Sequence, residues 1–118
     1  MSTTLEELQA EVVRFRDARE WARFHTPKNL AMGLGIEAGE LAELFLWKDD
    51  TEIATALGDP GYRARVAEEL ADVQVFLLFL SEATGIPLAD AVRTKMQRNA
   101  EKYPVEKARG NAKKYDEL

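Results

Sequence analysis

Four acidic side chains in two matching pairs are the residues of this sequence best suited to chemistry. Glu37 and Glu40 are three residues apart, and Glu69 and Asp72 repeat that spacing. Residues three apart are neighbours on one face of a helix, and apolar residues at intervals of three and four place Glu37 and Glu69 on core-facing rows. If the two helices pack as antiparallel neighbours, four carboxylates converge in one cleft.

Carboxylates gathered in one cleft raise one another's pKa or require cations. Among basic residues, only Arg65 lies in the same helical rows. A divalent cation is therefore the natural neutraliser, and oxygen coordination completed by phosphate suits Mg²⁺, with Mn²⁺ as a substitute. The alternative is that the acids lie at the edge of the apolar rows and are solvated. We predict a catalytic metal site made of Glu37, Glu40, Glu69 and Asp72.

Capping signals divide the chain into the helices that must position these acids. The signals are Thr4 with Glu7, Thr26-Pro27, Asp59-Pro60 and, as a stop, Gly85. The predicted helices span 5–21, 27–46, 60–83 and 87–103. The expected fold is all-α, a four-helix, antiparallel, bundle-like protomer.

Two features interrupt this helical pattern. Residues 47–60 are predicted to form a loop with one or two weak helical turns, and are the best candidate for a mobile flap. Gly33, Gly35 and Gly39 lie inside the second predicted helix, where each costs roughly 1 kcal/mol relative to alanine. We expect these glycines to permit close approach of another backbone or a ligand.

Composition indicates one globular domain over residues 1–118, with a polar, basic tail over 105–118. The 118 residues are 46% hydrophobic and 31% charged, enough for one core. The net charge of −5 disfavours nucleic acids and anionic membranes as partners. The segment Met1 to Thr4 does not resemble a secretory signal, and the apolar run 73–80 is far shorter than the ~20 residues of a membrane helix. We therefore predict a cytoplasmic protein.

Other metal and nucleotide sites fit the sequence less well. A ferritin-like di-iron site needs Glu-x-x-His pairs, and the single histidine, His25, lies outside both acid pairs. The acidic stretch 49–52 lacks the spacing and central glycine of an EF-hand. No phosphate-binding glycine-rich loop or His-Glu-x-x-His motif is present.

The paired acid motif resembles the signature of the MazG-like, all-α nucleoside triphosphate pyrophosphohydrolases. Further segments are similar to the small dCTP pyrophosphatase branch, and together they cover nearly the whole chain. These segments are 15–21, 24–30, 39–45 with Trp47-Lys48, Lys95-Met96 with Asn99 and Tyr103-Pro104, and 108–110 with 113–115.

The resemblance implies Mg²⁺-dependent hydrolysis of a nucleoside triphosphate to the monophosphate and pyrophosphate, by a dimer or a tetramer built from two dimers. It implies that the four acids are metal ligands. Residues implied to bind substrate are Trp21 and Trp47 flanking a pyrimidine base, His25 and Asn29 near the site, and Lys95, Asn99 and Tyr103 in the last helix. Val12 and Phe76 replace a histidine and a tyrosine of the mammalian dCTP enzymes near the expected base pocket, which argues against a strict preference for dCTP.

The carboxylates also fit a hydrolase on chemical grounds, and a basic region of the chain is suited to contact the phosphates. Metal ions held by carboxylates neutralise a triphosphate, and an unliganded carboxylate oxygen can activate water. The basic region containing Lys95 and Lys102 is expected to meet the phosphates in part. His25 is expected to be a hydrogen-bonded loop histidine. Trp21 and Trp47 fit a core or subunit-interface role as well as base stacking.

We predict hydrolysis of dCTP or a 5-modified dCTP, as part of nucleotide-pool house-cleaning. The alternative is a non-catalytic nucleotide-binding helical module or an oligomeric interaction protein. The apolar faces of four long helices also predict a homodimer or homotetramer.

Overall fold

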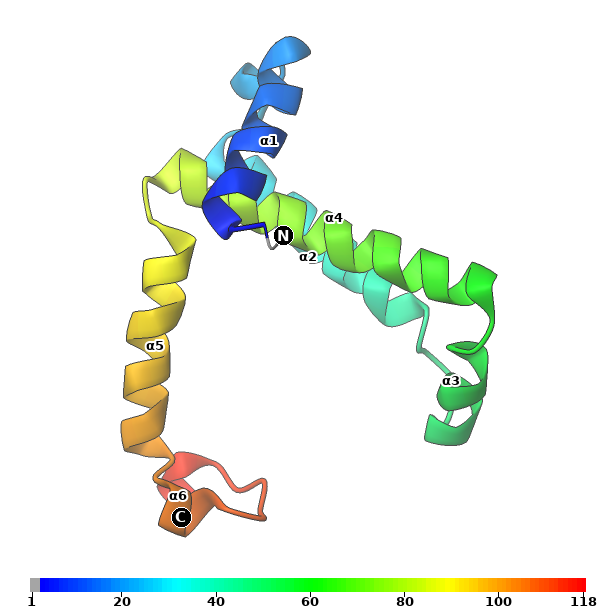
Figure 1. Cartoon of the computed structure of the whole chain (residues 1–118), viewed down its shortest axis with the longest axis vertical. Coiled ribbons are helices and arrows are strands. Elements are labelled where there is room, and N and C mark those ends of the chain that lie inside the picture. Colours follow the sequence, from blue (N-terminus) through cyan, green and yellow to red (C-terminus); the bar gives the residue numbers. More distant parts are fainter. Residues whose placement is uncertain (1–2) are drawn as a thin grey trace. The chain divides into compact units, whose positions relative to one another are not determined.

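A computed structural model describes residues 3–118 (Figure 1). Met1 and Ser2, which belong to the segment examined for a secretory signal, lie outside the described residues. The contacts between residues divide the chain into two units, which end and begin at Gly85 and Ile86. The helical elements are α1 Leu5–Ala18, η1 Ala22–Phe24, α2 Pro27–Glu43, α3 Asp50–Ala56, α4 Pro60–Thr84, α5 Leu88–Lys102, α6 Val105–Ala108 and η2 Tyr115–Glu117.

The all-α prediction is confirmed, since no strand occurs between residues 3 and 118. The four predicted helices correspond to α1, α2, α4 and α5. Of these, α1, α2 and α4 belong to the first unit and α5 to the second. The four-helix bundle and the single domain over 1–118 therefore stay predictions.

Three of the four predicted helix starts are confirmed by side-chain caps, and α5 begins at Leu88 without one. Thr4 accepts a hydrogen bond from the backbone N–H of Glu7, and Thr26 accepts one from that of Asn29. Asp59 caps α4 in the same way, at the N–H of Tyr62. Each cap satisfies a donor that the first helical turn leaves without a partner.

Two predicted helix ends are wrong by three residues. The first helix ends at Ala18 instead of residue 21, because Glu20 has a φ of 55°. The second ends at Glu43 instead of residue 46, and Trp47 follows with a φ of 65°. Positive φ is costly for residues other than glycine. Because neither position is a glycine, the sequence does not predict these two turns.

The remaining ends agree more closely with the sequence. Helix α4 ends at Thr84, and Gly85 supplies the left-handed cap residue with a φ of 70°. The stretch expected as a loop with weak helical turns contains α3, whose N-cap is Asp49.

Helices α2 and α4 pack side by side in opposite directions (Figure 1). Gly33 of α2 lies against the ring of Phe76. The two are so close that a Cβ at position 33 would come within 2.4 Å of the ring. At the other end of the pair, the Tyr62 hydroxyl donates to the Leu44 carbonyl at 2.6 Å. Gly33 thus permits close approach of the Phe76 side chain and not of the backbone or ligand that was predicted, and a Cβ at Gly35 or Gly39 would meet nothing within 4 Å in the described chain.

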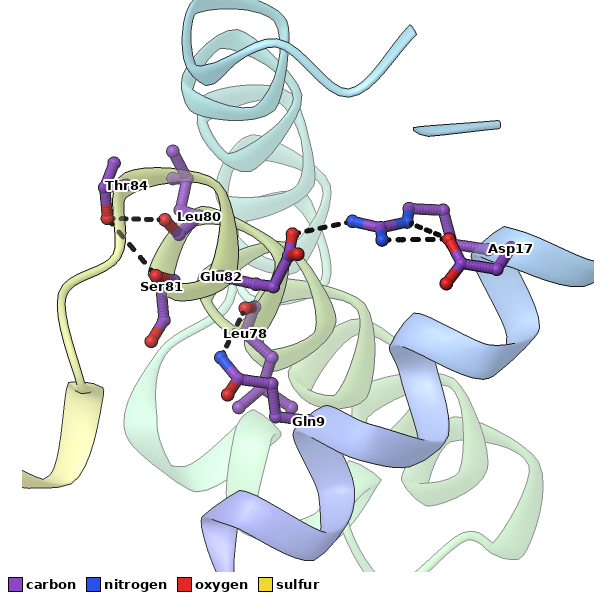
Figure 2. Close-up of polar contacts among 8 residues, drawn as sticks. Gln9, Asp17, Leu78, Leu80, Ser81, Glu82 and Thr84 are labelled. Carbon is purple, nitrogen blue, oxygen red and sulfur yellow. Dashed lines mark hydrogen bonds and ion pairs between the residues drawn. The ribbon is translucent and has the colours of Figure 1, made fainter. Parts of the chain in front are cut away.

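Helix α1 packs against the C-terminal half of α4 (Figure 2). The Gln9 side-chain amide donates to the Leu78 carbonyl at 3.1 Å. Arg16 is buried and its guanidinium lies 2.7 Å from Glu82 and 2.9 Å from Asp17. These contacts fix α1 across the part of α4 that follows the acid motif.

The second unit consists of α5 and the C-terminal segment. Lys102 lies over the ring of Tyr115, with Nζ 4.8 Å from the ring centroid, and Tyr103 meets the same ring edge-on at 6.2 Å. The tail expected to be extended or loosely helical thus includes a short helix, α6, and returns to the end of α5.

No single helix within residues 3–118 is long and apolar enough to cross a membrane. Only α4 and α5 taken together pass by length and composition, a test that core helices also pass. The cytoplasmic location stays a prediction.

Candidate metal and nucleotide site

Three of the four predicted acids converge between α2 and α4. Carboxylate oxygens of Glu37, Glu40 and Glu69 lie within 4.8 Å of one another. Glu37 and Glu69 are half-buried, and the Oε2 atom of each is buried without a hydrogen-bond partner. Buried polar atoms normally have partners, so these two oxygens are suited to a cation.

The electrostatics of this acid cluster disfavour three negative charges in the absence of a cation. Burial, followed by the charge of Glu40, raises the pKa of Glu37 from 4.5 to about 7. The pKa of Glu69 is also raised, again chiefly by burial. Within the described chain, no lysine or arginine forms an ion pair with these acids. A donor set of carboxylate oxygens alone fits a hard divalent cation such as Mg²⁺ or Mn²⁺.

Asp72 lies beside the cluster but outside the group of three. Its negative charge contributes to the raised pKa of both Glu37 and Glu69, so it is close to them. It is exposed and lines the neighbouring pocket. Its assignment as a fourth ligand stays a prediction.

A pocket of about 400 Å³ lies between α1 and α4, a volume typical of small-molecule sites. Helix α1 contributes Glu11, Val12 and Phe15, and the connection to α2 contributes Trp21 and His25. Trp21 packs edge-on against Phe15 with ring centroids 5.8 Å apart.

The opposite wall of the pocket comes from α4. Its residues are Asp72, Val75, Phe76 and Phe79. Because Asp72 follows Glu69 by one helical turn, the pocket begins next to the acid cluster. The structure thus joins a charged end, suited to metal and phosphate, to a mostly apolar end suited to a flat ring.

His25 differs from its expected role as a hydrogen-bonded loop histidine. Its Nδ1 atom is buried without a partner, and its ring packs on Phe79 with centroids 4.6 Å apart. Burial, then the charge of Arg16, lowers the pKa of His25, which keeps the imidazole neutral at pH 7. The expectation of a hydrogen bond is wrong for Nδ1, and a role in substrate binding stays a prediction.

Three predicted residues line the pocket, and two others do not. Trp21, His25 and Phe76 are lining residues. Trp47 is 91% exposed and is not among them. The Asn29 side chain donates to the Phe24 carbonyl at 3.1 Å, which stabilises the turn before α2.

The other predicted substrate contacts lie in the second unit. Lys95 lines a shallow groove of about 480 Å³ with Asp90 and Arg98. Asn99 donates to the Met96 sulfur at 3.7 Å. Lys102 and Tyr103 contact Tyr115, as described above. Their approach to a bound nucleotide stays a prediction.

Four pocket residues were not anticipated from the sequence. Phe15, Val75 and Phe79 follow the apolar spacing of ordinary core positions, which concealed their place at a cavity. Glu11 lies on α1, outside the paired acid motif. The crossing of α1 over α4 creates the pocket, and no local pattern specifies that crossing.

Comparisons with known proteins agree with this geometry. The MazG-like family model matches residues 33–118. Over 115 residues, which are 98% of this chain and 68% of each relative, the chain is 44% identical to dCTP pyrophosphatase 1 of Mus musculus and 42% identical to that of Homo sapiens. It also resembles the crystal structure of a pyrophosphatase from Archaeoglobus fulgidus, with a TM-score of 0.79 and 41% identity over 88% of this chain and 95% of that one.

Proposed function

Because the chain belongs to the MazG-like family, we propose that it hydrolyses dCTP or a 5-modified dCTP to the monophosphate and pyrophosphate, with Mg²⁺ as cofactor. Similarity to dCTP pyrophosphatases over 98% of the chain supports the enzyme class, a nucleoside triphosphate pyrophosphohydrolase. The observation that carries the metal requirement is the convergence of three carboxylates with two unpartnered buried oxygens.

The acid cluster supplies what this hydrolysis requires. Glu37, Glu40 and Glu69 would hold a divalent cation such as Mg²⁺, and Asp72 would complete the set at the mouth of the pocket. The cation would supply neutralisation of the charge on the phosphates. A carboxylate oxygen that is not bound to metal accepts a proton from water as the water attacks phosphorus. The phosphoanhydride bond breaks, and pyrophosphate leaves.

The aromatic pocket holds the base while the phosphates face the acids. Trp21 lines the pocket from the connection between α1 and α2, and Phe76 lines it from α4. Stacking on aromatic rings binds bases of any type. Lys95, Asn99, Lys102 and Tyr103 are proposed to complete the substrate site from α5 and its end. Nucleotide-pool house-cleaning is the proposed role.

Pyrophosphate release from a panel of ribo- and deoxynucleoside triphosphates tests this function. We expect release with Mg²⁺ or Mn²⁺, none with EDTA, and the highest rate with a cytosine deoxynucleotide. Absence of release from every nucleotide would overturn the enzymatic proposal. Metal-dependent binding without product would instead support the alternative, a nucleotide-binding helical module.

We also propose that the protein is a homodimer or homotetramer. Met32 and Ile36 on α2 are each 62% exposed, and Leu46 and Leu70 are more than half exposed. Large exposed apolar side chains in such number are typical of chains that associate with a partner. Light scattering at micromolar concentration tests this proposal, and a monomer would contradict it.

A further inference from the structure

A carboxylate outside the proposed metal site, that of Glu11, lines the pocket. It comes from α1, whereas the acids of the cluster come from α2 and α4. The Glu11 side chain is exposed, and within residues 3–118 it forms no hydrogen bond or ion pair, so its carboxylate is available to a ligand in the pocket.

The surrounding wall leaves few other polar groups to recognise a base. Val12 and Phe76 are apolar and offer no hydrogen bond, and the Nδ1 atom of His25 is buried. Asp72 follows Glu69 by one helical turn and therefore belongs to the charged end, next to the phosphates. The indole N–H of Trp21 can only donate a hydrogen bond, so it cannot accept one from an amino group of the base. Besides Asp72, the other carboxylate that lines the pocket is that of Glu11, which comes from α1, across the pocket from α4.

A carboxylate selects among pyrimidines by the group at position 4 of the ring. An ionised carboxylate only accepts hydrogen bonds. Cytosine carries an amino donor at this position, whereas thymine and uracil carry a carbonyl acceptor. A carbonyl facing a carboxylate leaves both oxygens without a donor, which is unfavourable.

We propose that Glu11 is a specificity-determining residue that accepts a hydrogen bond from the 4-amino group of cytosine. This inference rests on the proposed function, because it concerns the base of the nucleotide that the enzyme hydrolyses. It assigns to one residue of α1 the preference for cytosine over thymine and uracil.

The test compares the native protein with Glu11→Leu and Glu11→Lys. Leucine removes the acceptor, and lysine replaces it with a donor suited to the carbonyl of thymine. Glu6→Lys is the matched control, since Glu6 is an exposed acid on the same helix that does not line the pocket. Far-UV circular dichroism confirms that each variant is folded. The readouts are kcat/KM for dCTP and dTTP, and the binding of dCMP and dTMP by calorimetry with Mg²⁺.

We expect the native protein and Glu6→Lys to favour the cytosine nucleotide by roughly tenfold or more, as for a hydrogen bond to a charged group. The preference should fall to within about threefold in Glu11→Leu and reverse in Glu11→Lys. An unchanged preference in Glu11→Leu, or none in the native protein, would overturn the inference. If no triphosphate is hydrolysed, the proposed function fails, and the monophosphate affinities still decide the role of Glu11.

Discussion

Replacing Glu37 by glutamine should stabilise the metal-free protein at alkaline pH. Glutamine has nearly the same shape and does not ionise, so it removes one of the three crowded charges while keeping the side chain in place. The pKa of Glu37 is about 7 in the folded protein, against 4.5 ordinarily. The folded chain therefore binds this proton more tightly than the unfolded chain does.

The proton on Glu37 therefore stabilises the folded protein at low pH and not at high pH. Stability from the bound proton is fully present below pH 4.5 and is lost as the pH rises through 7. For a fully buried group the loss would be about 3 kcal/mol. Because Glu40 is exposed and water reaches the cluster, screening reduces this loss of stability to roughly 1–2 kcal/mol. At pH 8, Glu37→Gln should therefore melt roughly 4–10 °C above the native protein, and at pH 4.5 the two should nearly coincide.

Thermal unfolding in EDTA at pH 4.5 and pH 8 measures this effect. Glu43→Gln is the control, because Glu43 is an exposed acid on the same helix outside the cluster, and it should change stability by no more than about 0.5 kcal/mol. Mg²⁺ should raise the melting temperature of the native protein and leave that of Glu37→Gln nearly unchanged. Equal destabilisation of Glu37→Gln at both pH values would refute the argument from charge crowding.

Two further predictions concern helix packing and catalysis. Gly33→Ala should destabilise the fold by roughly 1–3 kcal/mol in urea unfolding, because the new Cβ would lie 2.4 Å from Phe76, whereas Gly35→Ala should stabilise it by up to about 1 kcal/mol; equal effects would show that the two glycines have equivalent surroundings. Glu40→Gln and Asp72→Asn should each lower pyrophosphate release by roughly 10²-fold or more with unchanged helical circular dichroism. Full turnover in either variant would remove that residue from the metal site.

Helix starts were predictable from the sequence because their determinants are local. A side chain at the cap, such as Thr26, bonds to a backbone N–H only three residues away. The end of α4 is also determined locally, because Gly85 adopts the left-handed conformation that ends the helix. The ends of α1 and α2 depend instead on Glu20 and Trp47, which adopt positive φ without the freedom of glycine. Because no glycine marks these turns, helical periodicity extends each predicted helix beyond its actual end.

The acid cluster was predictable for a similar reason, and the pocket was not. Helical periodicity places Glu37 and Glu69 on rows that also carry leucine and valine, and two such rows pack together. The pocket arises where α1 crosses α4, and that crossing is fixed by Gln9 and Arg16 through contacts 69 and 66 residues away in the chain. Residues that line a cavity and residues that fill a core have the same spacing, so Phe79 gave no separate signal.

The acid cluster also gives a physical reading of the charge on this protein. The four predicted ligands account for four of the five excess negative charges. Carboxylate oxygens of three of these ligands lie within 4.8 Å of one another. Such crowding costs stability unless a cation is bound, so it is poorly explained as a device for folding. Because Asp72 both contributes to this crowding and lines the pocket, bound metal changes the charge at the mouth of the nucleotide pocket. Metal and nucleotide should therefore bind with positive coupling, each raising the affinity of the other by the same factor.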